Sequence, residues 1–230
     1  MRSSMTQGDT LGVIIVYVYV ASLILITDRV ISKRYPMFGR KFLHIMTGNI
    51  AFILPLFNTR EIMVFLAAAP FILFTFMISP YSPVKSMQIK ASKAGHGLGL
   101  VYYSITWTVL GYLFFNHKEI IAVGILAMSY GDGLASVIGV KYGGRTYNVF
   151  GDVKSYAGSC VMFLSTFIIM IVALIFYDVS LSHIVLFYLV FIAFITTLVE
   201  GLTPKGIDNI TVPFITAGLY WLFYNIRWLT

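Results

Sequence analysis

Acidic residues inside apolar segments are the first candidates for chemistry in this sequence. Asp132 lies within Ser129-Tyr130-Gly131-Asp132-Gly133, in an apolar run that extends from about residue 119 to 140. A charged side chain at the centre of a membrane helix costs about 2.5–3.5 kcal/mol on insertion scales, so it usually faces a bundle interior or a hydrated cavity. Asp132 is therefore predicted to hold a metal ion or a proton. The alternative is a structural aspartate that is hydrogen-bonded between helices.

The neighbours of Asp132 support a polar site on one side of the helix. Ser129, Asp132 and Ser136 follow one another at three- and four-residue spacing, which places them on one face of an α-helix. Gly131 and Gly133 flank the carboxylate, and because they lack a side chain they let another backbone or a ligand approach.

Two further acids, Glu200 and Asp208, stand between the last two apolar runs, and Asn209 follows directly. Asp208 is well placed to cap the next helix, which is its simplest structural role. Glu200 ends an apolar run with no adjacent cation, and capping does not explain it. Together with Asp132, these residues offer the oxygen ligands that Mg²⁺ takes in proteins alongside substrate phosphates.

The segment from residue 141 to 159 combines glycines with basic side chains. Backbone amides at glycines, together with the N-terminus of a helix, attract anions, so this segment is predicted to cradle a polyphosphate. It is not a Walker A loop, because the Gly-x4-Gly-Lys-Ser/Thr spacing is missing. The alternative is an ordinary basic loop, which accounts for the charges but not for the glycines. The candidate phosphate-binding residues are Gly143, Gly144, Arg145, Lys154, Ser155 and Gly158.

A third polar group, Arg40-Lys41-x-x-His44, lies at the start of an apolar run. Arg40, His44 and Gly48 share a helical face at four-residue spacing. Long basic side chains at the end of a membrane helix commonly extend to the interface, so Arg40 and Lys41 alone say little. His44 lies one turn deeper, and both a structural and a functional role fit it.

The elements that must position these residues are membrane helices. The chain has 230 residues, 59% hydrophobic and 11% charged, with a mean hydropathy of +0.88. Soluble domains carry roughly 25% charged residues, and runs of about 20 apolar residues, long enough to span a bilayer, recur throughout. We predict an all-α, polytopic, single membrane domain covering residues 1–230. Its eight predicted spans are 10–28, 41–58, 61–79, 97–115, 119–140, 156–177, 181–199 and 210–227.

The distribution of basic residues predicts the orientation. An excess of Lys and Arg marks the cytoplasmic side, so the long links at 29–40, 80–96, 141–155 and 200–209 face the cytoplasm and both termini face away. The net charge of +7 therefore reports topology rather than nucleic-acid binding, and the single Cys160 excludes an internal disulfide. Twelve of the 16 basic residues lie in or beside these links: Arg29, Lys33, Arg34, Arg40, Lys41, Lys85, Lys90, Lys93, Lys141, Arg145, Lys154 and Lys205.

The chain resembles the dolichol kinase and phytol kinase family, which is related to the phosphatidate cytidylyltransferases. The resemblance covers most of the chain and ends at Glu200 and Asp208-Asn209-x-Thr211-x-Pro213. Ala157 stands where Glu is expected in many relatives. The motifs that carry the resemblance are Arg40-Lys41-x-x-His44-x3-Gly48, Gly131-Asp132-Gly133-x-Ala135-x2-Ile138-Gly139-x3-Gly143 and Lys154-Ser155-x2-Gly158-Ser159.

The resemblance implies transfer of the γ-phosphoryl group of CTP to the hydroxyl of a membrane isoprenoid alcohol of the dolichol, polyprenol or phytol type. By the same analogy Asp132 would bind Mg²⁺ or Mn²⁺, with Glu200 or Asp208, and would share catalysis with Lys154 and His44. The triphosphate would lie against the candidate phosphate-binding residues. The acceptor side would include Arg40, Lys41, His44, Asp208 and Asn209.

Two other functions fit a polytopic chain of this kind. The phosphatidate cytidylyltransferases share CTP and a Lys-[Ser/Thr]-x-x-Gly element, but they usually end on a denser group of Lys, Arg and Asp than is found here. A transporter is the alternative from another class, although no internal repeat is visible and the ionisable residues lie toward one surface. We therefore expect a multi-pass enzyme of a prokaryotic cell membrane or the endoplasmic reticulum, with its site facing the cytoplasm.

Overall fold

The structure, a computed structural model, describes residues 5–85, 88, 97–204 and 206–227. It divides into two compact units, Met1–Lys118 and Glu119–Thr230, and each is described by itself below. Three of the basic residues that indicate the orientation, Lys90, Lys93 and Lys205, lie outside the described residues. The single membrane domain expected from the sequence stays a prediction.

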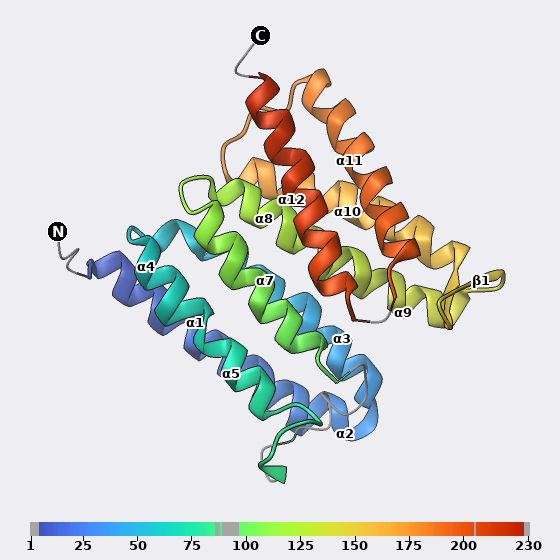
Figure 1. Ribbon diagram of the computed structural model, residues 1–230, viewed down its shortest axis with the longest axis horizontal. Coiled ribbons are helices and arrows are strands. Elements are labelled where there is room, and N and C mark those ends of the chain that lie inside the picture. The colour runs from blue at the N-terminus through green and yellow to red at the C-terminus, as the bar shows by residue number, and fades with distance from the viewer. Residues whose placement is uncertain (1–4, 86–87, 89–96, 205, 228–230) are drawn as a thin grey trace. The chain divides into compact units, whose positions relative to one another are not determined.

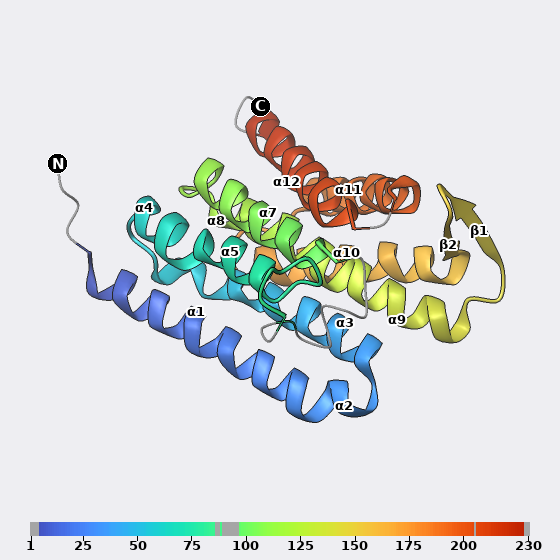
Figure 2. The same ribbon diagram turned by 60° about the horizontal axis from the view of Figure 1, so that its bottom comes forward.

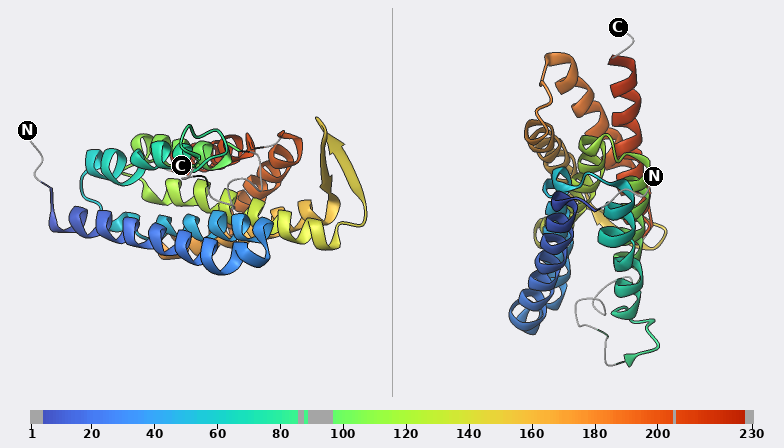
Figure 3. Two further views of the ribbon diagram at one scale, coloured as in Figure 1. Left: turned by 90° about the horizontal axis from the view of Figure 1, so that it is seen from below. Right: turned by 90° about the vertical axis from the view of Figure 1, so that its left-hand side faces the viewer.

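The described part of the first unit is helical (Figure 1). Figure 3 shows α1 (Gln7–Ile26) running along α3 (Pro36–Thr47), and α1 is in contact with α3 and with η4 (Met63–Ala68). The α-helices are α1 (Gln7–Ile26), α2 (Ser32–Arg34), α3 (Pro36–Thr47), α4 (Arg60–Ile62), α5 (Pro70–Met77) and α7 (Gly99–Leu113). The π-helical segments are η1 (Thr27–Ile31) and η4 (Met63–Ala68), and the 3₁₀ segments are η2 (Gly48–Phe52) and η3 (Leu54–Leu56).

A buried carboxylate fixes the start of the first helix. Thr6 and Asp9 form a capping box at the N-terminus of α1, which satisfies backbone N–H groups that no helical carbonyl reaches. The Asp9 side chain also accepts hydrogen bonds from the Asn58 and Thr59 amides, at 2.8 and 3.0 Å, and from the Thr59 hydroxyl at 2.8 Å. One fully buried residue therefore ties α1 to the turn that precedes α4.

The second predicted span, 41–58, is not a regular α-helix. The α-helix α3 starts earlier than expected, at Pro36, and gives way to 3₁₀ turns from Gly48 onward. Pro55 lies in the second 3₁₀ segment and lacks the amide hydrogen that an α-helix would require there. The tighter winding changes which residues share a face of the helix. The spacing of apolar residues in the sequence does not show where this change occurs.

The second unit is built on one long buried helical segment and three further helices. Lys118–Tyr142 is continuous, with 78% of its most apolar window buried. Its parts are α8 (Lys118–Leu126), the π-helical η6 (Ala127–Asp132) and α9 (Gly133–Tyr142). The other helices are α10 (Tyr156–Phe176), α11 (His183–Leu202) and α12 (Asp208–Arg227). Helix α9 contacts α10, α10 contacts α11, and α11 contacts α12.

A β-hairpin joins α9 to α10, a feature that the all-α prediction did not include. Strands β1 (Thr146–Val149) and β2 (Asp152–Ser155) pair antiparallel and project beyond the helix ends (Figure 2). The two turn residues, Phe150 and Gly151, both have positive φ, at 48° and 84°. Positive φ at both positions is the geometry of a tight two-residue hairpin turn, which glycine favours.

Close contact between α9 and the start of α10 depends on small residues. A Cβ atom at Gly139 would lie 2.9 Å from the Ser155 hydroxyl, and one at Gly158 would lie 3.1 Å from the Ala135 carbonyl oxygen. Gly131 faces α10 in the same way, 2.5 Å from the Thr166 hydroxyl oxygen if a Cβ is added. Several glycines of the family-like motifs therefore serve helix packing.

Five helical segments of the described chain are long and apolar enough to cross a membrane, which agrees with a multi-pass helical protein. Three more predicted spans are helical but shorter or more polar, namely α3 with its 3₁₀ extension, α7 and α12. The count of eight spans and the outward orientation of both termini stay predictions. The five segments are Gln7–Arg34, Arg60–Met77, Lys118–Tyr142, Tyr156–Phe176 and His183–Leu202.

Candidate active site

Three carboxylates that are far apart in the sequence meet in the second unit. Asp132, Glu200 and Asp208 each offer a ligand atom, and these atoms all lie within 4.8 Å of one another. Asp132 is 9% and Glu200 is 8% exposed, while Asp208 is half-buried. These are the three residues expected to bind a metal ion, so the structure brings the predicted ligand set together.

Asp132 is placed by a π-helical distortion of the long buried helix. It is the last residue of η6, after which α-helical winding resumes at Gly133. A π-helical turn takes in one additional residue and is frequent at functional sites. The expected α-helical face of Ser129, Asp132 and Ser136 is therefore interrupted, although Asp132 itself is buried as predicted.

Glu200 and Asp208 are brought together by the short connection between α11 and α12. Glu200 lies in the last turn of α11, and Asp208 is the first residue of α12. The hydroxyls of Thr203 and Thr211 are 3.2 Å apart and tie the two helix ends together. Gly206, with φ of +80°, supplies the left-handed backbone that the tight connection requires.

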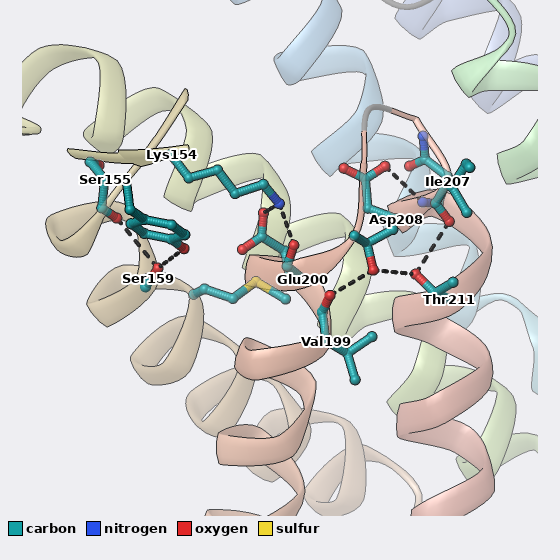
Figure 4. Close-up of polar contacts among 12 residues, drawn as sticks. Lys154, Ser155, Ser159, Val199, Glu200, Ile207, Asp208 and Thr211 are labelled. Atoms are coloured by element: carbon teal, nitrogen blue, oxygen red, sulfur yellow. Dashed lines mark hydrogen bonds and ion pairs between the residues drawn. The ribbon is translucent and has the colours of Figure 1, made fainter. Parts of the chain in front are cut away.

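Lys154 reaches this carboxylate group from the second strand of the hairpin. Its ammonium nitrogen lies 2.6 Å from Glu200 Oε1 and also donates to the Glu200 backbone carbonyl (Figure 4). The two side chains are only 15% and 10% exposed. A charge-assisted bond with so little exposure is stronger than a surface ion pair, so the hairpin delivers a cation into the acidic cluster.

Tyr147 anchors the strand that carries Lys154, a role that the sequence analysis missed. It is the direct cross-strand partner of Lys154, and its hydroxyl lies 2.8 Å from the Ser159 hydroxyl on α10. Its ring packs beside Tyr156, and its hydroxyl lies 3.1 Å from where a Cβ would stand on Gly201. Only the strand pairing identifies Tyr147, because nothing in the sequence shows that residues 146–155 form a hairpin.

The predicted phosphate-binding residues divide into two groups. Ser155 caps α10 by accepting a hydrogen bond from the Gly158 amide at 3.0 Å, so both residues take part in the helix start. A Cβ at Gly143 would lie 2.8 Å from that of Ser155, which makes Gly143 a packing residue as well. Gly144 and Arg145 are exposed, and added bulk at Gly144 would meet nothing within 4 Å. These two are the members whose surroundings leave room for a ligand.

The residues expected on the acceptor side fall in both units. Arg40, Lys41 and His44 lie on α3 of the first unit, where Arg40 and Lys41 are partly exposed and His44 is 7% exposed. The His44 ring packs edge-on against Tyr103, with centroids 4.9 Å apart. In the second unit, the Asn209 amide donates to Asp208 Oδ1 at 2.9 Å, so this residue orients the carboxylate beside it.

The donor set fits a hard divalent cation. Carboxylates held at this spacing repel one another unless a cation or a proton compensates them. Two oxygens bound to the same Mg²⁺ at about 2.1 Å stand at most about 4.2 Å apart, close to the 4.8 Å limit of this cluster. Oxygen-only ligands, two of them buried, are what Mg²⁺ or Mn²⁺ prefers, and the group contains neither thiolate nor imidazole.

Comparison with known proteins points to one kind of enzyme. A phytol kinase of Synechocystis sp. is 34% identical over 128 residues, which is 55% of this chain and 54% of that protein. A probable chloroplastic phytol kinase of Triticum aestivum is 28% identical over 242 residues, 97% of this chain and 80% of that protein. Phytol kinase 1 of Arabidopsis thaliana, also chloroplastic, is 30% identical over 196 residues, 77% of this chain and 64% of that protein.

The match to the cyanobacterial relative spans about half of each chain, whereas the plant relatives match over most of this one. No family model and no solved structure matches. The resemblance to the dolichol and phytol kinase family, drawn from the motifs around Asp132, Lys154 and Asp208, is confirmed by these relatives.

Proposed function

We propose that this chain is a membrane kinase that transfers the γ-phosphoryl group of CTP to the hydroxyl of an isoprenoid alcohol. The proposal includes a Mg²⁺- or Mn²⁺-dependent site that faces the cytoplasm. The observation that carries it is the convergence of Asp132, Glu200 and Asp208 beside Lys154. The similarity to proteins named phytol kinase supplies the reaction class and the kind of acceptor.

The residues of the cluster divide the work of binding a nucleotide. Asp132, Glu200 and Asp208 would hold the metal, which when bound neutralises charge on the triphosphate oxygens. Lys154 already lies among these carboxylates, so a small rotation of its flexible side chain would carry its ammonium from Glu200 to a phosphate oxygen. Arg145 is exposed next to the hairpin and would add a second cation.

The transfer itself makes one bond and breaks one. The alcohol oxygen forms a bond to the γ-phosphorus, the bond to the bridging oxygen of the β-phosphate breaks, and CDP leaves. The hydroxyl proton passes to a base, for which Asp132, Glu200, Asp208 and His44 are the candidates. Phosphoryl transfer depends mainly on positioning and charge neutralisation. The carboxylates would therefore contribute chiefly by holding the metal ion in a buried position.

The decisive experiment uses the purified protein in detergent with Mg²⁺, an isoprenoid alcohol, and CTP labelled separately at the γ- and α-phosphates. The expected result is label in the lipid from γ-labelled CTP alone. Competition with unlabelled ATP tests the choice of nucleotide.

Other outcomes would replace the proposal. Label that arrives from the α-phosphate with phosphatidate as acceptor would make the protein a cytidylyltransferase. If no lipid is labelled under either condition, the kinase reading fails and transport becomes the hypothesis to test.

A further inference from the structure

The first unit contains a pocket that is lined mainly by apolar side chains, with His44 among the lining residues. Its empty volume is about 840 Å³, a figure that includes space open to the outside. The described residues that line it include no Asp, Glu, Lys or Arg. Its described walls come from α1, α3, the 3₁₀ segments η2 and η3, the segments η4 and α5, and α7.

The pocket is elongated along the helices. On α1 it is lined by Val16, Val20 and Ile24, which span about 12 Å at the helical rise of 1.5 Å per residue. Along η4 and α5 it is lined from Met63 to Thr75, and Ile78, just past the end of α5, also lines it. A long, narrow, apolar space within membrane-embedded helices suits a hydrocarbon chain better than a compact polar ligand.

The polar groups of the wall are mostly engaged within their own helices. Thr47 donates to the Leu43 carbonyl at 2.7 Å, and Thr75 donates to the Phe71 carbonyl at 2.6 Å. Trp107 differs, because its indole N–H is buried and has no hydrogen-bond partner in the part of the chain that the structure describes. Trp107 is 8% exposed and lines the pocket, so its N–H group offers a hydrogen-bond donor to a molecule bound there.

We propose that this pocket binds the hydrocarbon chain of an isoprenoid alcohol, the acceptor of the proposed kinase. The identity of the acceptor rests on the proposed function, and the location of its hydrocarbon chain rests on the pocket. An isoprenoid chain carries alkene π-electrons along its length, and these accept from an indole N–H. A saturated hydrocarbon chain carries none, so the Trp107 donor favours an isoprenoid chain.

A substitution that fills the pocket tests its use in turnover. Ala67 lines the pocket and is 7% exposed, so Ala67→Leu adds bulk inside it. The matched control is Ala21→Leu, which adds the same bulk at an exposed position on α1, next to the lining residue Val20. In Ala67→Leu we expect the KM for geranylgeraniol to rise about tenfold or more, with the KM for geraniol and for CTP unchanged. Equal kinetics in both variants would overturn the inference.

A binding measurement keeps the inference testable without turnover. A geranylgeraniol analogue with a diazirine at its tail is photolysed with the Asp132→Asn protein, and the labelled peptides are identified by mass spectrometry. We expect label on peptides that contain Met63 or Trp107, competed by geranylgeraniol but not by hexadecanol. Label confined to other peptides, or equal competition by hexadecanol, contradicts the pocket assignment.

The two assays separate the failure of this inference from the failure of the proposed function. If wild-type protein phosphorylates no alcohol but the probe labels the pocket, the kinase proposal fails and the isoprenoid site stands. If wild-type protein phosphorylates geranylgeraniol but the probe does not label the pocket, the kinase proposal stands and the hydrocarbon chain of the alcohol binds elsewhere.

Discussion

At the scale of single residues, the acidic cluster gathers three carboxylates within 4.8 Å of one another. Asp132 and Glu200 are each less than one-tenth exposed, and the Lys154 ammonium contacts Glu200. Buried charges of one sign are costly in a low-dielectric place. Their proximity therefore favours a site that is completed by a cation.

The first prediction concerns Asp132. Asp132→Asn keeps the size of the side chain but removes a charged ligand, so lipid phosphorylation should fall more than ~100-fold. Binding of Mn²⁺, followed by electron paramagnetic resonance, should weaken in parallel. Ser136→Ala, one turn further along the same helix, is the control and should retain both. Wild-type turnover and Mn²⁺ affinity in Asp132→Asn would exclude Asp132 as a metal ligand.

The second prediction concerns the ion pair between Lys154 and Glu200. Lys154→Met leaves a buried carboxylate without its cation, and removing one partner of a buried pair costs about 3 kcal/mol in soluble proteins. We expect a lower thermal midpoint in the metal-free protein, together with a raised KM for CTP. The double variant Lys154→Met/Glu200→Gln should recover the midpoint but not the activity. If the double variant stays as unstable as Lys154→Met, the charge pair is not the cause.

At the scale of elements, two connections position the cluster. The short link between α11 and α12 holds Glu200 and Asp208 close, and the hairpin between α9 and α10 delivers Lys154. A second pair of hydroxyls, Thr196 and Thr216, joins α11 and α12 at 2.9 Å within the fully buried interior. The two threonine pairs differ in their distance from the acids, which allows their roles to be separated.

The third prediction compares these threonine pairs. Thr203→Val removes the contact with Thr211 beside the cluster, and Thr196→Val removes the contact with Thr216 deeper in the helix pair. Each lost interhelical hydrogen bond should lower stability by about 0.6 kcal/mol, the average found in membrane helices. Only Thr203→Val should also weaken Mn²⁺ binding, because only that pair fixes the relative position of Glu200 and Asp208. Equal Mn²⁺ affinities in the two variants would contradict this account.

The fourth prediction separates packing glycines from ligand glycines. A methyl group at Gly143 would overlap the Gly139 carbonyl oxygen and approach Ser155, so Gly143→Ala should destabilise the protein by about 1–3 kcal/mol. Gly144 has open space around it, so Gly144→Ala should leave the thermal midpoint unchanged. An increase in the KM for CTP in Gly144→Ala at unchanged stability would support a nucleotide contact there. An unchanged KM would remove Gly144 from the proposed nucleotide site.

At the scale of the whole molecule, the placement of helices along the chain agrees with a multi-pass protein. Every predicted span coincides with helical structure in the described residues, although only five segments are both long and apolar enough to cross a bilayer on their own. Short or polar spans are tolerated where other helices cover them. The charge distribution predicts which links face the cytoplasm.

The fifth prediction tests that orientation. In a Cys160→Ser background, which has no other cysteine, single substitutions Asn116→Cys and Gly144→Cys place one thiol in each kind of link. Both positions are exposed. A membrane-impermeant maleimide added to intact cells should label Asn116→Cys and should label Gly144→Cys only after permeabilisation. The reverse pattern would overturn the proposed orientation and the cytoplasmic site with it.

The sequence by itself determined the features that depend on residue type and local pattern. Apolar run lengths are enough to predict membrane helices, and acids in such runs are costly enough to indicate a site. Residue types, together with the family resemblance, predict Asp132, Glu200 and Asp208 as metal ligands. The structure brings their ligand atoms within 4.8 Å of one another.

Only the tertiary structure decided how the chain winds and which distant residues touch. The π-helical turn before Asp132, the 3₁₀ turns after Gly48 and the hairpin of Tyr147 and Lys154 are not visible in the pattern of apolar residues. The ion pair of Lys154 with Glu200 and the apolar pocket beside Trp107 likewise join separate segments. The local sequence determines which segments form apolar helices. Contacts of this kind depend instead on how the helices pack against one another, which no single segment encodes.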